Sequence, residues 1–241
     1  MPFPIRPRQN IAGIRAPIVF LCTLRFMKRY LPFLIVAAVA LITCAGGFAL
    51  YRSKKLAAPS ATSGAAGGIH VRGKADAAVT IEEFGDFQCP PCGTMSGVLH
   101  KLGEEYGARL RLIFHHFPLA VHAHAREAAI AAEAAHEQGK FWEMHDVLYK
   151  EQALWSKAPD VPALFTGYAS SIGLDVERFK KDLLNPGIAA RVDADQKLGA
   201  SRGVTSTPTL FVNNTNLPAA EINPTGVHKA VEAALHPEAK K

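Results

Sequence analysis

The feature that most constrains this chain is a pair of cysteines, three residues apart, between a predicted strand and a predicted helix. The pair reads Cys89-Pro90-Pro91-Cys92. Residues 78–84 before it are dense in apolar and β-branched side chains, which is typical of a buried strand. Residues 89–106 begin near two prolines and end before Gly107, which is typical of a helix. We therefore expect both cysteines in the first turn of a helix that follows a strand.

The rest of the pattern predicts an α/β domain with many helices. Residues 109–117 are expected to form a second strand, parallel to the first because a helix connects them. A third strand is expected at 209–212 and a last helix at 227–235. Five helical segments lie between, separated by Pro, Gly or Asp: 123–138, 141–151, 161–172, 176–184 and 188–201. No clear last strand follows residue 212, so one edge of the sheet is left unassigned.

The spacing of the two cysteines at a helix start favours redox chemistry. A thiolate at the N-cap is stabilised by the positive end of the helix dipole and by backbone N–H groups, so the Cys89 thiol is predicted to be acidic. Cys92 is close enough to attack a mixed disulfide at Cys89. The helix start tolerates Pro90, whereas Pro91 removes a further N–H donor. We therefore expect a moderately low pKa for Cys89 and a moderate oxidant.

Two other uses of the motif stay open: a static disulfide and a metal site. A metal would need further ligands, and the candidates on paper are His115, His116, His122 and His124. There is no second Cys-x-x-Cys pair, and the prolines stiffen the loop, so no metal is predicted. The four histidines are interpreted as strand-end and helix-start residues. One helix is expected to bury Phe141, Trp142, Met144, His145 and Leu148.

A charge-free apolar segment, residues 31–50, precedes the domain. At about 1.5 Å per residue, a helix of this length crosses a hydrocarbon core of about 30 Å. Most basic residues of the leader lie before the segment, so the positive-inside rule keeps residues 1–30 in the cytoplasm and exports the rest. The segment is longer than the apolar part of a usual signal peptide, which favours an uncleaved anchor over a cleaved signal. A further hypothesis is that translation starts at Met27.

Residues 51–68 separate this leader from the domain. They are rich in Ala, Gly and Ser and are predicted to form a flexible tether. Residues 1–68 contain nine of the 27 basic residues and none of the 21 acidic ones. The basicity therefore belongs to the leader, which argues against nucleic-acid binding by the domain. Residues 69–241 are long enough to fold alone.

Several ordered segments of the domain together resemble one protein family. They are residues 76–81, Glu83-Phe84-x-Asp86-Phe87 before the cysteine pair, Phe117-Pro118-Leu119 with His122 and Ala125, residues 139–146, Gly173-Leu174-Asp175 with Phe179, and Thr207-Pro208-Thr209. Over nearly all of residues 73–212, the chain resembles the DsbA-like thiol:disulfide oxidoreductases of the thioredoxin superfamily. The resemblance implies an α/β thioredoxin fold with an inserted α-helical subdomain at about 118–202, here preceded by a transmembrane helix.

The resemblance also implies roles for individual residues. Cys89 matches the nucleophile of the family and Cys92 the resolving thiol. Pro208 matches a cis-proline that lies next to the cysteine pair. Thr207, which precedes that proline, would offer its backbone N–H and C=O groups to an extended substrate segment. Pro90 and Pro91 complete the motif.

Glu83 matches a position at which the family often buries a carboxylate below the cysteines. Such an acid can exchange a proton with the resolving thiol. The alternative is a solvated carboxylate at a strand end, and Glu82 next to it leaves the register open by one residue. The redox-active disulfide Cys89–Cys92 is expected to work without an organic cofactor or a metal.

The sequence thus predicts a thiol–disulfide oxidoreductase of the cell envelope, anchored in the inner membrane by residues 31–50 with its domain in the periplasm. We expect it to donate disulfides to the thiols of exported proteins and to pass electrons to a quinone-linked membrane partner that the family implies. One alternative is a reductase or isomerase that uses the same two sulfurs. A second is a tethered chaperone-like binding module whose disulfide is structural.

Overall fold

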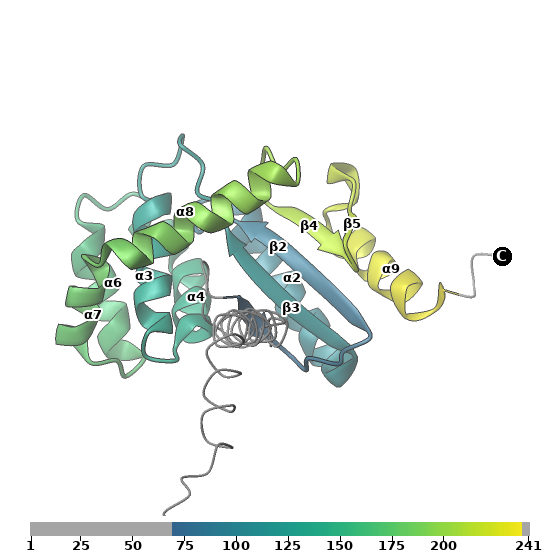
Figure 1. Cartoon of the computed structure of the whole chain (residues 1–241), viewed down its shortest axis with the longest axis horizontal. Coiled ribbons are helices and arrows are strands. Elements are labelled where there is room, and N and C mark those ends of the chain that lie inside the picture. Colours follow the sequence, from purple (N-terminus) through teal and green to yellow (C-terminus); the bar gives the residue numbers. More distant parts are fainter. Residues whose placement is uncertain (1–68, 238–241) are drawn as a thin grey trace, which may run out of the picture. The chain divides into compact units, whose positions relative to one another are not determined.

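A five-stranded mixed sheet forms the centre of the computed structural model, which describes residues 69–237 (Figure 1). In this part of the chain the strands are β1 (His70–Arg72), β2 (Val79–Gly85), β3 (Leu110–His116), β4 (Thr209–Val212) and β5 (Thr215–Asn216). Their order across the sheet is β1-β3-β2-β4-β5. β2 and β3 are parallel, and the other neighbouring pairs are antiparallel.

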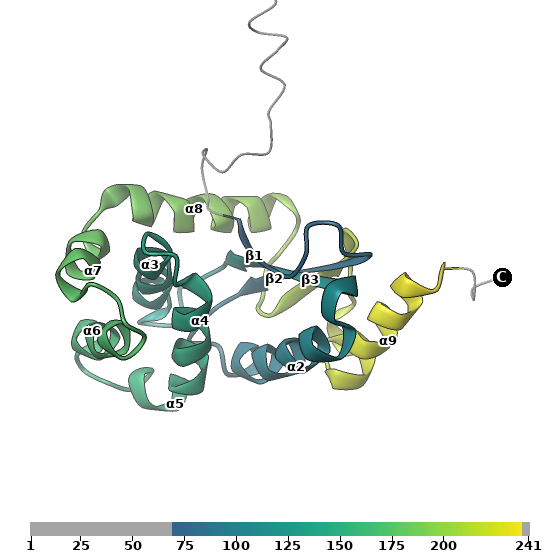
Figure 2. The same cartoon turned by 90° about the horizontal axis from the view of Figure 1, so that it is seen from below.

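Helices cover both faces of this sheet (Figure 2). α2 (Pro90–Tyr106) and α9 (Pro224–Leu235) lie on one face, and α8 (Pro186–Ser201) crosses the other. An apolar layer that includes Val79 and Ile81 of β2 packs under α2 and α9. On the opposite face, α8 comes close because Gly199 has no side chain. A Cβ added there would lie 2.7 Å from the Phe117 ring.

The chain between β3 and α8 forms a group of helices beside the sheet (Figure 1). They are α3 (Ala125–His136), α4 (Phe141–Lys150), α5 (Gln152–Trp155), α6 (Val161–Ser171) and α7 (Val176–Leu183). Side-chain caps fix several starts: Asp160 accepts a hydrogen bond from the Ala163 N–H, and Asp175 from the Arg178 N–H. The fully buried side chains of this group include Trp155, Phe165 and Phe179, and they belong to one apolar cluster with Phe114 of β3 and the two cysteines.

The predicted mixed α/β class is confirmed, and the predicted helices form with ends shifted by three residues or fewer. Three short elements were not predicted: β1, β5 and α5. Each has two to four residues, too few to show a period. The unassigned sheet edge is β5, which pairs with β4 through a turn at Asn213 and Asn214. Both residues have positive φ, 46° and 65°, a conformation that Asn tolerates in a two-residue hairpin turn.

The predicted cytoplasmic leader, membrane anchor and tether all lie outside the described residues. Among the helices of residues 69–237, none combines the length and the apolar character needed to cross a membrane.

Candidate active site

The two cysteines lie where β2 gives way to α2. Cys89 is the N-cap residue of α2, with φ −76° and ψ 118°, and Cys92 lies in the first turn, as the spacing predicted. Both are free thiols. Cys89 keeps 5% of its surface exposed, whereas Cys92 has none. A partner molecule can therefore reach the first sulfur only. The prolines between them, Pro90 and Pro91, are exposed and border the approach to Cys89.

The two thiols differ strongly in acidity. The pKa of Cys89 is lowered from 9.0 to about 6, chiefly because the Cys92 thiol donates a hydrogen bond to its sulfur. The Thr207 side chain also favours the thiolate, while burial opposes it. The pKa of Cys92 is raised far above its usual range, first by burial and then by its hydrogen bond to Cys89. At neutral pH the site therefore holds a thiolate at Cys89 and a thiol at Cys92.

A peptide bond from the other end of the domain completes this side of the site. The Thr207–Pro208 bond, just before β4, is cis. When protonated, the Cys89 thiol donates to the Thr207 carbonyl, at 3.3 Å. While Cys89 is protonated, the buried Thr207 hydroxyl has no hydrogen-bond partner among the residues that the structure describes, so it is free to donate to the Cys89 thiolate. The Cys89 side chain makes no capping hydrogen bond as a thiol, but the backbone N–H of Cys92 helps to stabilise its thiolate.

The register of β2 settles which of two glutamates faces the cysteines. Glu83 lies on the same face as Val79 and Ile81, toward α2, and it is 3% exposed. Glu82 faces the other way and accepts a hydrogen bond from Arg202 Nη1 at 2.6 Å. Burial, assisted by the charge of Cys89, raises the pKa of Glu83 from 4.5 to about 8. Its charge in turn opposes ionisation of Cys92.

A buried carboxylate, Asp86, shapes the loop between β2 and Cys89. It accepts hydrogen bonds from the Gln88 N–H at 2.7 Å, the Leu119 N–H at 2.9 Å and His122 Nδ1 at 2.6 Å. The sequence analysis matched Asp86 to the family but gave it no role, and it interpreted His122 as a helix-start residue. That interpretation is wrong, because α3 begins at Ala125 and His122 instead pairs with Asp86.

Gln152, at the start of α5, is a second residue that the sequence analysis missed. Its Nε2 donates to the Phe87 carbonyl at 2.7 Å and to the Cys89 carbonyl at 2.9 Å. It therefore ties the helical group to the backbone of the cysteine loop. No local pattern in the sequence marks Gln152, because its partners lie more than 60 residues away.

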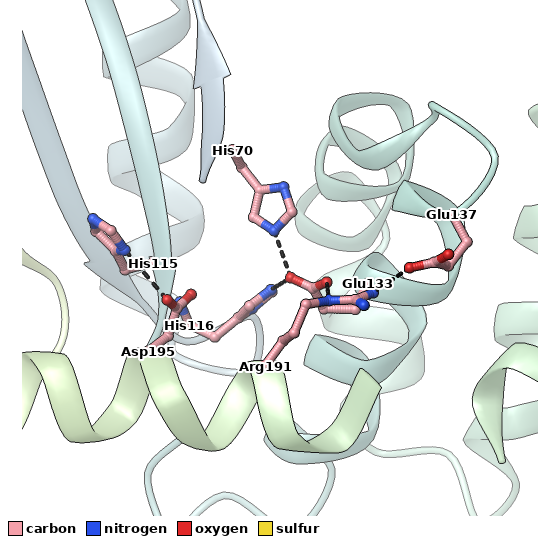
Figure 3. A network of polar contacts seen from close by, with 7 residues as sticks. All are labelled: His70, His115, His116, Glu133, Glu137, Arg191 and Asp195. Atoms are coloured by element: carbon pink, nitrogen blue, oxygen red, sulfur yellow. Dashed lines mark hydrogen bonds and ion pairs between the residues drawn. The ribbon is translucent and has the colours of Figure 1, made fainter. Parts of the chain in front are cut away.

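Histidines and carboxylates form a separate buried network (Figure 3). Glu133 of α3 lies between His70 of β1 and His116 of β3, and its other oxygen accepts from Arg191 Nε at 2.6 Å. These two histidines and Glu133 could provide three metal ligands. Their ligand atoms are already hydrogen-bonded to one another, and the Arg191 guanidinium already balances the carboxylate. The arrangement therefore fits a structural network better than a metal centre. His115 instead lies beside Asp195 of α8, at 3.4 Å.

The fold and the site define a class of protein. A helix begins at a cysteine pair with one acidic, accessible thiol and one buried thiol, beside a cis-proline loop on a sheet covered by helices. This is the arrangement of thioredoxin-like proteins. A family model described as thioredoxin matches residues 65–233, so the chain belongs to the thioredoxin family.

Solved structures of DsbA-like proteins agree with this assignment and confirm the predicted family. A thioredoxin-like oxidoreductase from Silicibacter pomeroyi is 25% identical, with a TM-score of 0.59 over 69% of this chain and 92% of that protein. Oxidised BdbD from Bacillus subtilis is 25% identical, with a TM-score of 0.61 over 72% and 99%. DsbA2 from Pseudomonas aeruginosa, 24% identical with a TM-score of 0.57 over 74% and 100%, shows the same fold.

Curated relatives match about 60% of the chain. The Na(+)/H(+) antiporter NhaA 1 of Salinispora arenicola is 41% identical over 145 residues, which are 60% of this chain and 21% of that protein. The Na(+)/H(+) antiporter NhaA of Herminiimonas arsenicoxydans is 37% identical over 148 residues, 61% of this chain and 23% of that protein. The chain thus spans only about a fifth of the length of these relatives.

Proposed function

We propose that this chain is a thiol–disulfide oxidoreductase of the cell envelope that donates disulfides to exported proteins. The observation that carries the proposal is the asymmetry of the two cysteines. Cys89 is accessible and its pKa is lowered to about 6, whereas Cys92 is fully buried and its pKa is raised. A static disulfide would need neither a stabilised thiolate nor a buried acid beside it.

The proposed reaction begins with the disulfide Cys89–Cys92. A substrate thiolate attacks Sγ of Cys89, and Cys92 leaves as a thiolate that takes a proton from the protonated Glu83 carboxyl group. A second substrate thiolate then attacks the substrate sulfur of the mixed disulfide. Cys89 leaves as a thiolate, the substrate holds a new disulfide, and the two electrons stay on the cysteine pair. Thr207 would align an extended substrate segment through its backbone groups, beside Pro208.

The stability of the thiolate supports the proposed direction. An enzyme that stabilises its own thiolate favours its reduced form, and its disulfide is therefore oxidising. The pKa of Cys89, about 6, lies between about 7 for thioredoxin and about 3.5 for the most oxidising members of this class. This supports a moderately oxidising enzyme. A reductase or isomerase that uses the same sulfurs is the second candidate, favoured by the absence of a more acidic Cys89.

The site of action and the partners are part of the same proposal. Residues 31–50 would anchor the chain in the inner membrane, with the domain in the periplasm, and a quinone-linked membrane protein would reoxidise the cysteine pair. The similarity to the thioredoxin-like oxidoreductase of Silicibacter pomeroyi supports a redox role. The antiporter name belongs to relatives about five times as long as the matched segment, so we propose no transport activity for this chain.

The decisive experiment is the equilibrium reduction potential of the full chain in detergent, measured against glutathione buffers. A value closer to about −120 mV than to about −270 mV supports disulfide donation, and a value near about −270 mV supports a reductase. Cys89→Ala should abolish oxidation of a reduced test protein. If the variant still supports the cellular function, the chaperone-like module with a structural disulfide is correct instead.

A further inference from the structure

The protonation of Glu83 raises a question of access, because the proposed reaction changes its proton at every turnover. The carboxylate lies on a central strand under α2 and is 3% exposed. Within residues 69–237, its Oε1 atom has no hydrogen-bond partner. A proton that leaves Cys92 through Glu83 therefore starts from a group with very little contact with solvent.

A small cavity adjoins Glu83 on this face of the sheet. Its volume is about 10 Å³, which is about the space of one water-sized sphere. Strand β2, helix α2 and helix α4 all contribute to its wall, through Glu83, Ser96 and His145 among others. Glu83 and His145 therefore line the same small cavity, one from the sheet and the other from α4.

The His145 imidazole borders this cavity and also contacts a partly exposed carboxylate. Its Nδ1 atom is 2.8 Å from Oδ1 of Asp146, whose side chain is 47% exposed. The other oxygen of Asp146, Oδ2, accepts a hydrogen bond from Arg72 Nη2 at 2.7 Å. Among the described residues, the buried Nε2 atom of His145 has no partner. One ring nitrogen thus contacts an exposed carboxylate, and the other is buried and free to bond.

We propose that His145 relays protons between Glu83 and solvent, through a water molecule in the cavity. In the resolving step, Glu83 in its ionised form takes the proton of the Cys92 thiol. The Cys92 sulfur attacks Sγ of Cys89, the mixed disulfide bond breaks, and the partner molecule leaves as a thiolate. The proton then passes from Glu83 to Nε2 of His145, while Nδ1 releases its own proton to Asp146 and solvent. The reverse path supplies a proton when Cys92 leaves. This inference rests on the proposed function, and His145 acts only through Glu83.

The charge environment keeps the imidazole able to accept. Burial lowers the pKa of His145, so the ring is neutral at pH 7, and Asp146 opposes that effect. Several titratable or charged groups surround the ring. They are Arg72 of β1, Glu83 of β2, His116 of β3, His100 of α2, and Asp146 and Tyr149 of α4 itself. Rings of Phe87, Phe114 and Trp142 also pack against it, so a purely packing role is the competing explanation.

The test is a single-turnover measurement on the full chain in detergent. A mixed disulfide between Cys89 and glutathione is prepared, and the rate at which Cys92 releases glutathione is followed with pH in H₂O and D₂O. His145→Gln keeps a polar side chain but cannot relay a proton. We expect it to slow release by about tenfold, less than the roughly 10²-fold or more of a group that exchanges a proton directly with the reacting atoms, and to change the solvent isotope effect. The equilibrium constant with glutathione should change less than about twofold.

Two comparisons distinguish a proton relay through His145 from a packing role of His145 and from a different proton route to solvent. Ser96→Ala and His100→Gln alter the α2 side of the same cavity and should leave the rate unchanged. The double variant Glu83→Gln/His145→Gln should be no slower than Glu83→Gln, because the two residues act in series. If the two effects multiply, or if His145→Gln matches the wild type, the inference is wrong. If His145→Gln does not fold, Asp146→Asn replaces it, with a smaller slowing expected and none if the inference is wrong.

The same data distinguish failure of this inference from failure of the proposed function. If Glu83→Gln releases glutathione as fast as the wild type, the proton transfer proposed for Glu83 is wrong, and the relay through His145 is wrong as well. If Glu83→Gln is slow and His145→Gln is not, exchange through Glu83 stands and only the relay is overturned.

Discussion

Replacing the buried acid with its neutral isostere should make the protein more stable at neutral pH. The ordinary pKa of a glutamate is 4.5, and burial raises that of Glu83 to about 8. Below pH 4.5 the residue is protonated in both the folded and the unfolded chain. As the pH rises, the unfolded chain loses this proton first, which favours unfolding until the folded chain ionises near pH 8.

The magnitude follows from these two values. Neutral pH lies about 2.5 pH units above 4.5, and each unit is worth about 1.4 kcal/mol. Glu83 should therefore lower the free energy of unfolding of the reduced protein by about 3 kcal/mol at pH 7. Glu83→Gln removes the ionisable group and should recover about this amount at pH 7, but almost none at pH 4.

Urea denaturation of the full chain in detergent, at several pH values between 4 and 9, measures the difference. Trp155 is fully buried and provides a fluorescence signal. Glu82→Gln is the matched control: the same change on the adjacent residue removes an ion pair with Arg202 and should lower stability by about 1 kcal/mol or less. If Glu83→Gln raises the free energy of unfolding equally at pH 4 and pH 7, the reasoning is refuted. The increase must be larger at pH 7, because Glu83 of the unfolded wild type is ionised there.

Three further predictions concern the thiols and the buried network. The rate of Cys89 alkylation by iodoacetamide should rise with a midpoint near pH 6, while Cys92 stays unmodified at neutral pH; mass spectrometry of the two sites checks both. Thr207→Val should raise the midpoint of Cys89 alkylation by about 0.7 pH units, because losing one hydrogen bond to the thiolate costs about 1 kcal/mol. An unchanged midpoint would show that the Thr207 hydroxyl does not stabilise the thiolate. Arg191→Met leaves the buried Glu133 carboxylate without its cation and should destabilise the fold by about 3 kcal/mol in urea. Arg126→Met, which breaks an exposed pair with Asp193, should cost no more than about 1 kcal/mol, and equal losses would contradict the importance of burial.

The sequence predicted those parts of the fold whose signals are local. Prolines, glycines and Asp caps mark the helix ends, so α2, α6 and α7 were placed within a residue or two. β1 was missed because its three residues become a strand only by pairing with β3. The Asn213-Asn214 turn was a usable signal for β5 that the sequence analysis did not apply.

In the candidate site, too, local motifs predicted some residues, whereas others are brought together only by the folded chain. Cys89 and its N-cap position follow from a motif of four residues, and the structure places them as expected. The choice between Glu82 and Glu83 needed the register of β2 against its neighbours. Gln152 and the Asp86–His122 pair needed the folded chain, since they join segments that are distant in sequence.

The placement of β1 has a mechanical consequence. Any pull exerted through residues 1–68 enters the domain at Ile69 and is met first by the short β1–β3 ladder and by the buried ring of His70. β1 is an edge strand, and β3 separates it from β2, the strand that leads to Cys89. Tension on the leader would therefore loosen the sheet at an edge, two strands away from the cysteines, before it disturbed the geometry of the thiols.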